Sequence, residues 1–274
     1  MTCRYSTIFI FLFVLTIAAN GQSSAVADSL FAAGDYTSAA VEYERCYYLA
    51  TSRTNGRTAL ENKAQCYKRM GSFDRAAATL ERYATTYDDY QQLALCQYLA
   101  SDFEKAAASI VRCQALADTI GTDLLLIKTL TLNELLLYDS ALSTALTLAS
   151  QQMKRPAFEL AHQLYTLYST RPQAKSEQTA RRLSYIPGMG HLYARQWDLG
   201  MTAFTLNAAL LSFGVWQVIE GCYLTAWVGG AGLLSATYPG QMRSAEAATR
   251  QYNRQQADTF NAKARQFLLD TFAP

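Results

Sequence analysis

Residues 34–45 read GDYTSAAVEYER and residues 71–82 read GSFDRAAATLER, and the two segments share one pattern. Each begins with glycine, has an aromatic residue two positions later and has alanine three positions after that. Related segments begin at Ser101 and Leu136, so the steps between copies are 37, 30 and 35 residues. Glycine lets the chain reverse, and small residues let two antiparallel helices approach closely. The spacing predicts an all-α protein in which helix pairs stack into a solenoid over residues 22–170.

This pattern resembles the tetratricopeptide repeat, with a degenerate fourth copy, and the resemblance covers about half of the chain. It implies a concave surface that holds a peptide or a partner protein. Aromatic side chains often anchor such contacts, and packing between helices is the alternative role for each of them. The tyrosines that the sequence offers as partner contacts are Tyr47, Tyr48, Tyr87, Tyr90 and Tyr98.

Residues 1–21 have the features of a secretory signal peptide. A single charge, Arg4, precedes an apolar run over residues 8–19, and small residues follow that run. The run is short for a membrane span, so we expect cleavage at its end, with an uncleaved anchor as the alternative. Export permits disulfides, and Cys66 and Cys96 occupy equivalent positions in neighbouring copies. Either these two cysteines form a bridge or, like the others, they are small buried residues of helices.

Two uncharged stretches follow a polar segment, residues 171–182, which we predict to be a linker. The stretches are Leu199–Ile219 and Gly221–Met242, and each is long enough to cross about 30 Å of hydrocarbon as a helix. The sequence therefore predicts a two-helix membrane hairpin, with a buried soluble hairpin as the alternative. Residues 243–272 predict a C-terminal amphipathic helix. Arginines flank the outer ends of the two stretches, which opposes the positive-inside rule and leaves the topology open.

Residues 183–274 are predicted to form one module, because one motif lies before the two uncharged stretches and another overlaps the start of the predicted C-terminal helix. The chain reads LSYIPGMGHLY from Leu183 and AEAATRQYN from Ala245. These motifs resemble a module of membrane proteins of the Bacteroidota, and the resemblance covers about the last 95 residues. It implies a location in a membrane and no particular reaction. His191 stands where that module has glutamine. The residues singled out in the first motif are Pro187, Gly188, Gly190, His191 and Tyr193.

The composition argues against several classes of function. With 24 Lys and Arg against 22 Asp and Glu, the net charge is +2, so we expect no nucleic-acid partner. The chain has two histidines and no recognisable catalytic or metal-ligand spacing, so we expect neither an enzyme nor a cofactor. We expect an inner-membrane protein whose repeats lie in the periplasm and bind a protein or peptide of an envelope assembly, while the hairpin contacts membrane lipid. The alternative is an envelope enzyme or transport component that uses Glu220, the charge between the two stretches.

Overall fold

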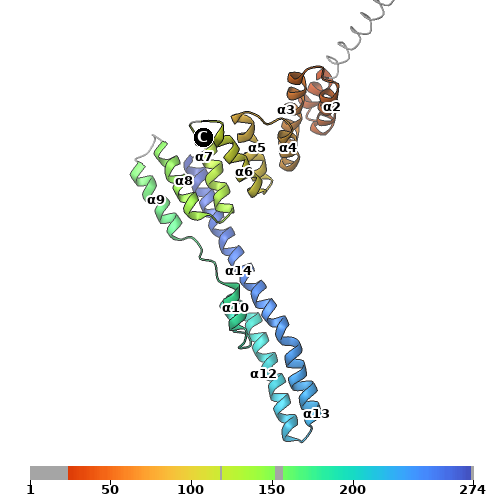
Figure 1. Cartoon of the computed structure of the whole chain (residues 1–274), viewed down its shortest axis with the longest axis vertical. Coiled ribbons are helices and arrows are strands. Elements are labelled where there is room, and N and C mark those ends of the chain that lie inside the picture. Colours follow the sequence, from red (N-terminus) through yellow and green to blue (C-terminus); the bar gives the residue numbers. More distant parts are fainter. Residues whose placement is uncertain (1–23, 118, 152–156, 273–274) are drawn as a thin grey trace, which may run out of the picture. The chain divides into compact units, whose positions relative to one another are not determined.

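The computed structural model describes residues 24–117, 119–151 and 157–272, and every regular element in these ranges is a helix (Figure 1). The all-α prediction is therefore confirmed for this part of the chain. The predicted signal peptide, residues 1–21, lies outside the described residues. The chain divides into two compact units, one ending at Tyr165 and the other beginning at Thr166.

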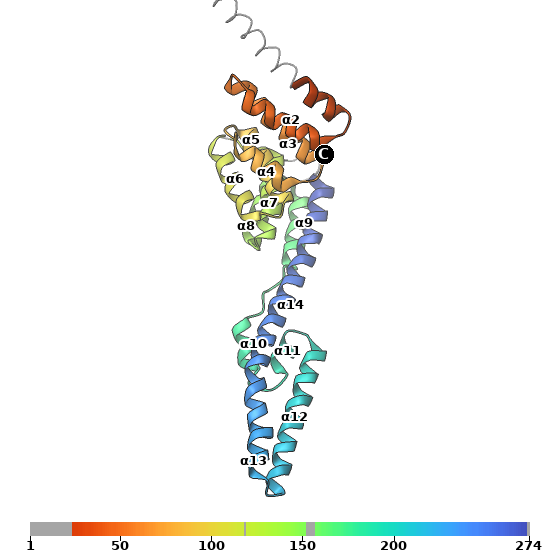
Figure 2. The ribbon, with the colours of Figure 1, turned by 90° about the vertical axis from the view of Figure 1, so that its right-hand side faces the viewer.

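The first unit is a row of antiparallel helices in which each helix packs against its neighbours in sequence (Figure 2). Sequential pairs of this kind are consistent with a repeat array. The unit begins with a helix over residues 24–32. It continues with α2 (Tyr36–Leu49), α3 (Arg53–Arg69), α4 (Phe73–Glu81), α5 (Tyr87–Leu99), α6 (Phe103–Ala115), α7 (Thr122–Glu134) and α8 (Tyr138–Gln151). The next helix, α9 (Ala157–Ser169), crosses the division between the units.

The four turn positions of the sequence pattern all adopt a left-handed backbone. Their φ angles are 83° at Gly34, 70° at Gly71, 62° at Ser101 and 61° at Leu136. At each turn, the next amide donates to the carbonyl five residues earlier, as Asp35 N–H does to Leu30 O at 3.0 Å. This hydrogen bond satisfies a carbonyl that the end of the helix would leave without a partner.

The alanines that follow these turns pack at the centre of the helix pairs. Each lies five residues after its turn residue and has no exposed surface; the four are Ala39, Ala76, Ala106 and Ala141. A larger side chain would push the two helices apart. The register expected from GDYTSAAVEYER and GSFDRAAATLER therefore recurs in all four helix pairs.

The second unit contains short helices and two long helical runs that form a hairpin. Its elements are α10 (Glu177–Leu183), α11 (Met189–Tyr193), α12 (Trp197–Ile219), α13 (Tyr223–Thr225), the π-helix η1 (Ala226–Gly232) and α14 (Leu233–Phe272). Helix α12 runs beside η1, and α10 and α11 pack against α14.

Two boundaries in this unit differ from the sequence prediction. Residues 177–182, predicted to belong to a linker, form most of α10, because the Ser176 hydroxyl accepts the Thr179 N–H at 3.3 Å and caps the helix. The predicted second stretch and the predicted C-terminal helix are one nearly continuous helical run, since α14 passes through residue 243 without a break. The change from uncharged to charged residues there alters the surface of the helix and does not end it.

The turn of the repeat array recurs twice in the second unit. Arg195 has a φ of 60° and Gly221 a φ of 76°. Two positions after each turn residue stands an aromatic residue, and five positions after it stands a buried small residue. Trp197 and Gly200 follow Arg195, and Tyr223 and Ala226 follow Gly221. The apolar hairpin is thus closed by the same turn as the helix pairs of the first unit.

Candidate functional site

The first unit contains a cavity of about 520 Å³ between its first three helices. Tyr43 forms a buried wall of this cavity, and its hydroxyl donates a 2.6 Å hydrogen bond to Asp28 Oδ1. The remaining lining comes from the first helix, the end of α2, the turn after it and α3: Ser24, Cys46, Ala50, Thr51, Asn55, Thr58, Ala59 and Asn62. Most of this lining can form hydrogen bonds.

Three polar residues of α3 face this cavity. Asn55, Thr58 and Asn62 are spaced by three and four residues, which places them on one face of the helix. An amide side chain offers both a donor and an acceptor, as a peptide bond does. Asp28 is the one charged residue in the lining, so the cavity favours a ligand that donates hydrogen bonds or carries positive charge.

Ion pairs tie neighbouring helix pairs together beside the cavity. Glu44 accepts from Lys63 Nζ at 2.6 Å and from Arg82 Nη1 at 2.9 Å, and the Arg82 guanidinium lies 4.6 Å from the centre of the Tyr47 ring. Burial raises the pKa of Glu44, but the hydrogen bonds from Lys63 and Arg82 outweigh it, so the pKa lies below its ordinary value. This network fixes α2 against α3 and α4.

A second ion pair links α3 to α5. Arg57 Nη2 donates to both carboxylate oxygens of Asp89, at 2.7 and 2.8 Å. Asp89 also accepts the N–H groups of Thr85 and Thr86, each at 3.0 Å. Burial raises the pKa of Asp89, but these hydrogen bonds lower it more, and the pKa lies below the ordinary value of 3.8. Asp89 therefore joins two repeats and also caps α5.

The five tyrosines predicted to contact a partner have different surroundings. Tyr48 is 73% exposed, whereas Tyr98 is 9% exposed and packs its ring 5.6 Å from Phe103. Tyr47 is half-buried under Arg82. Tyr87 and Tyr90 pack against core clusters, and the Tyr87 hydroxyl accepts the Gly121 N–H at 3.2 Å. Tyr48 is therefore the one member of this set that presents most of its side chain to solvent.

The structure does not form the disulfide considered from the sequence. Cys66 and Cys96 are buried free thiols in different core clusters, with Cys66 beside Ala39 and Cys96 beside Leu93. Equivalent positions in a repeat face their own helix pair and not each other. Burial raises the pKa of Cys66 to about 11 and also raises that of Cys96, so both thiols stay protonated at neutral pH.

The glycines of the first C-terminal motif lie where a side chain does not fit. Gly188 has a φ of 85°, and an added Cβ would collide with the carbonyl oxygen of Gly200. A Cβ on Gly190 would lie 2.7 Å from the Ala180 oxygen and 2.8 Å from the Ala245 Cβ. These glycines therefore let α10, α11, α12 and α14 approach one another.

The two C-terminal motifs meet around Lys175. The backbone N–H of Lys175 donates to Asn253 Oδ1 at 2.8 Å, and Asn253 Nδ2 donates back to the Lys175 oxygen at 2.9 Å. The Lys175 ammonium donates to the Tyr193 oxygen at 2.6 Å and lies 4.2 Å from the centre of the Tyr252 ring. Residues from both ends of the module thus hold the base of the hairpin together.

His191 belongs to the same contact region. It is buried, and its Nε2 lies 2.9 Å from the Ser244 hydroxyl oxygen. Burial disfavours the charged imidazolium and lowers the pKa of His191 below 6.5. Pro187, which precedes these residues, lines the apolar groove described below.

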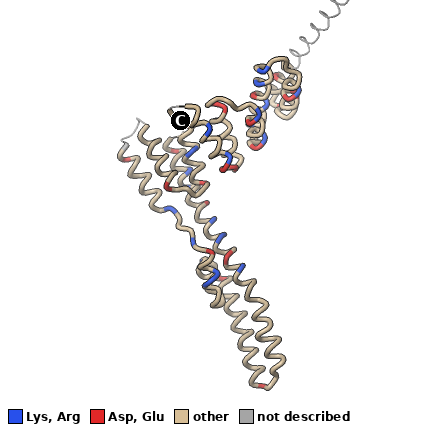
Figure 3. The backbone as a smooth tube through the Cα atoms, in the orientation of Figure 1, with Lys and Arg blue, Asp and Glu red and all other residues tan. Residues whose placement is uncertain are grey.

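Helix α12 is apolar and faces outward. It has 23 residues and is long and apolar enough to cross a membrane, and only 17% of its most apolar window is buried. Apolar side chains cover its outer surface, among them Phe204, Leu206, Leu211, Val215 and Trp216. The facing helix carries no charge from Tyr223 to Met242, as the tan region of Figure 3 shows. Glu220 lies at the exposed tip between them.

No protein-family model, curated protein or solved structure matches the chain. In the described ranges, no cluster of three or more His, Cys, Asp or Glu side chains has the geometry to hold a metal ion.

Proposed function

We propose that the protein is a membrane-attached interaction scaffold of the cell envelope. Its tetratricopeptide-like array lies in the periplasm and binds a peptide segment of a partner protein, and its apolar hairpin lies in the inner membrane. The observation that carries the proposal is that a polar peptide-sized cavity and an outward-facing apolar hairpin occur in separate compact units of one chain.

The hairpin supports membrane attachment through its length and its exposed surface. At 1.5 Å per residue, the 23 residues of α12 extend roughly 35 Å, slightly more than the hydrocarbon core. The facing run from Tyr223 to Met242 extends roughly 30 Å and is uncharged. Exposed apolar surface on this scale is unusual for a soluble protein, and it indicates contact with lipid or with another protein.

The proposed arrangement places the ends of the hairpin on one side of the membrane. Helices α10 and α11 lie at one end of α12, and the tip at Glu220 lies at the other (Figure 2). Helix α14 returns from the tip past α10. With α12 and the first part of α14 as two spans, the charged remainder of α14 lies on the same side as α10.

The cavity supports recognition of a peptide backbone. Asn55 and Asn62 supply paired donors and acceptors, and Asp28 supplies a negative charge held in place by Tyr43. We expect the partner segment to be extended, because an extended chain leaves its N–H and C=O groups free for such side chains. A lysine or arginine of the partner would lie near Asp28.

Site-specific photocrosslinking in intact cells tests the peptide cavity. A photoreactive amino acid at Thr58, on the cavity wall, should give a crosslinked product that disappears when Asn62 is replaced by alanine. The same photoreactive residue at Ala78, an exposed position of α4 outside the cavity, is the matched control. Equal products from positions 58 and 78, or a product that is insensitive to Asn62→Ala, would contradict the proposal.

A further inference from the structure

An apolar groove of about 1410 Å³ runs along one face of the hairpin. Residues from both long helices line it, including Leu210, Val218, Trp227 and Leu234. On the second helix the lining extends from Tyr223 to Met242, which corresponds to roughly 30 Å. The groove therefore runs for most of the hydrocarbon thickness of a bilayer, and its volume exceeds the roughly 300–1,000 Å³ of pockets that take small ligands.

The floor of the groove is made by two glycines that bring the helices into contact. A Cβ on Gly230 would lie 2.9 Å from the Gly214 Cα, and one on Gly214 would lie 3.3 Å from the Gly230 Cα. Gly230 belongs to the π-helix η1. Because the helices touch through backbone atoms, the larger side chains on either side stand up as walls, and a channel remains between them.

Arginines surround one end of the groove. Arg181 lines the groove and also lines two smaller cavities, of about 310 and 420 Å³. Arg243 lines the first of these cavities and Arg182 the second. Arg181 forms a loose ion pair with Glu246 at 3.6 Å. Arg182 and Arg243 have no ion pair within the part of the chain that the structure describes.

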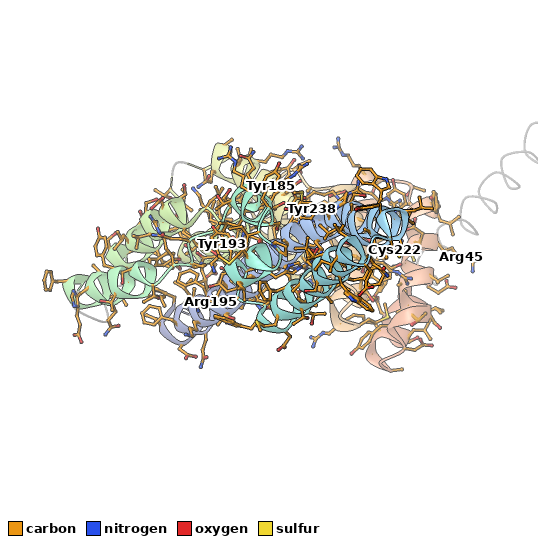
Figure 4. All side chains as sticks on the ribbon, turned by 90° about the horizontal axis from the view of Figure 1, so that it is seen from below. Arg45, Tyr185, Tyr193, Arg195, Cys222 and Tyr238 are labelled. Atoms are coloured by element: carbon orange, nitrogen blue, oxygen red, sulfur yellow. The ribbon has the colours of Figure 1, made fainter. Side chains whose placement is uncertain are left out.

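Two tyrosines stand at the boundary between the apolar groove and its basic end. The rings of Tyr185 and Tyr238 have centroids 6.5 Å apart, and the Tyr238 hydroxyl donates to the Tyr185 carbonyl (Figure 4). Both residues line the groove. Tyrosine is enriched at the level of lipid headgroups because its ring is apolar and its hydroxyl is polar. The basic end of the groove therefore corresponds to the membrane surface.

We propose that the groove binds one anionic phospholipid, with an acyl chain along the hairpin and the phosphate between Arg181, Arg182 and Arg243. The charge pattern favours this occupant over others. An uncharged partner helix would fill the apolar part and leave the guanidinium groups of Arg182 and Arg243 without an anion, whereas a phosphate accepts paired hydrogen bonds from guanidinium groups. A headgroup with net negative charge suits three arginines and one carboxylate better than a zwitterionic headgroup. This inference rests on the proposed membrane attachment.

Fluorescence quenching in defined bilayers tests the lipid site. Trp227 lines the groove and is 73% exposed, so replacement of Trp197 and Trp216 by phenylalanine leaves a single reporter inside the site. The full chain is reconstituted with phosphatidylglycerol or phosphatidylethanolamine whose acyl chains are brominated, because bromine quenches tryptophan on contact. We expect brominated phosphatidylglycerol to bind more tightly, by about fivefold for each arginine that contacts the headgroup.

Three variants assign the preference to the groove. Combined Arg181→Gln, Arg182→Gln and Arg243→Gln should abolish the preference for phosphatidylglycerol. Arg254→Gln is the matched control, because Arg254 lies three turns further along α14 and outside the groove. Ala231→Phe, which places a ring in the groove, should weaken quenching by both lipids. Circular dichroism of each variant verifies that the helices are intact.

The outcomes separate this inference from the proposed function. Release of the protein from membranes by alkali would contradict membrane attachment and the lipid site together. A protein that resists alkali but is quenched equally by the two lipids would overturn the lipid site alone. The same conclusion would follow if Arg254→Gln reduced the preference as much as the triple variant did. It would also follow if Ala231→Cys gave an efficient disulfide crosslink between two copies of the chain.

Discussion

The helix pairs of the first unit and the apolar hairpin of the second share a type of turn, but their large apolar side chains point in opposite directions. Both use a left-handed residue, an aromatic residue two positions later and a small residue at the fifth position, as at Gly71 and Gly221. In the first unit the large apolar side chains, such as Leu60 and Leu80, point inward. In the hairpin, Leu206 and Val215 point outward. The turn therefore determines how two helices are joined, and the placement of the apolar side chains determines which face they bury.

The interior of the hairpin also differs from the core of the repeats in the residues that join the helices. Asn207 is 1% exposed, and its Nδ2 donates to Gln241 Oε1 at 3.0 Å and to the Ala203 oxygen at 2.6 Å. Gly214 and Gly230 supply another contact between the helices. Small residues and interhelical amide hydrogen bonds are typical of helix contacts in lipid, where burial of apolar surface provides no driving force. The first unit depends on buried leucine and alanine instead.

Placing a charge at an exposed apolar residue of each unit gives the largest expected difference between the two units. Leu206→Arg puts a charge near the middle of α12, where the cost of insertion into a bilayer is about 3 kcal/mol. Val41→Arg changes a residue of α2 that is 65% exposed and should leave the stability of the array within about 0.5 kcal/mol.

Membrane fractionation and thermal unfolding of the two variants measure this difference. We expect Leu206→Arg to lower the membrane-integrated fraction strongly, while Val41→Arg remains indistinguishable from the natural protein in both assays. If Leu206→Arg is integrated normally and unfolds normally, the outer surface of α12 faces water, and the comparison between the units is wrong.

Glycine substitutions in the two units should differ in cost, because one glycine allows close packing and the other allows a left-handed backbone. Gly190→Ala should destabilise the second unit by about 1–3 kcal/mol, because the methyl group has no space between α10, α11 and α14. Gly71→Ala meets no atoms within 4 Å, so its cost should be about 1 kcal/mol and arise from the φ of 70° alone. Urea unfolding followed separately for each unit measures both, and a larger loss for Gly71→Ala would show that strain outweighs packing.

Removing the charge of Asp89 should weaken the first unit without affecting the second. Asp89→Asn loses the ion pair with Arg57 and part of the α5 cap, which we expect to cost about 1–2 kcal/mol. Asp74→Asn changes an exposed acid in the first turn of α4 and is the matched control. Thermal unfolding should show a lower midpoint for the first change only, and equal midpoints would remove Asp89 from the account of how repeats are joined.

The smallest predicted effect is a difference in acid sensitivity. The pKa of His191 is lowered in the folded chain, so the unfolded chain binds protons more readily below pH 6.5, and the second unit loses stability as pH falls through that range. The pKa of Asp89 is also lowered, and its contribution to the first unit is present above pH 3.8 and is lost as pH falls below it.

Unfolding curves between pH 3 and 8 separate the pH range in which His191 titrates from the range in which Asp89 titrates. His191→Gln keeps a side chain able to bond Ser244 but cannot titrate, so it should remove the loss of stability over the interval that begins at pH 6.5 and extends to lower pH. A second unit whose stability is unchanged over that interval in the natural protein would contradict the role assigned to burial of His191.

The sequence predicts the turns well because their chemistry is local. A helical hairpin is specified by a short local pattern, in which Gly34 or Gly71 is followed by an aromatic residue and an alanine. The turn at Arg195 was missed because arginine is not typical of a left-handed position. Helix α10 was also missed, although Ser176 followed by Glu177 is a recognisable helix start.

The sites could not be predicted because they depend on contacts between distant residues. The cavity requires Asp28 and Asn62 on different helices, and the joined motifs require Lys175 beside Asn253. The groove depends on a π-helix at Gly230 that matches Gly214 on the facing helix. The motif residues could be identified from the sequence, but their partners could not.

Alkaline extraction of the mature full-length chain, followed by protease treatment of sealed membranes, tests whether the hairpin crosses the bilayer. The chain carries one tag inserted after residue 170 and another after residue 274, and mass spectrometry verifies that residues 1–21 have been removed. Our account predicts that the protein stays in the membrane at high pH and that both tags are digested from the periplasmic side. Release of the protein by alkali, or tags on opposite sides of the membrane, would contradict a hairpin that crosses the bilayer twice.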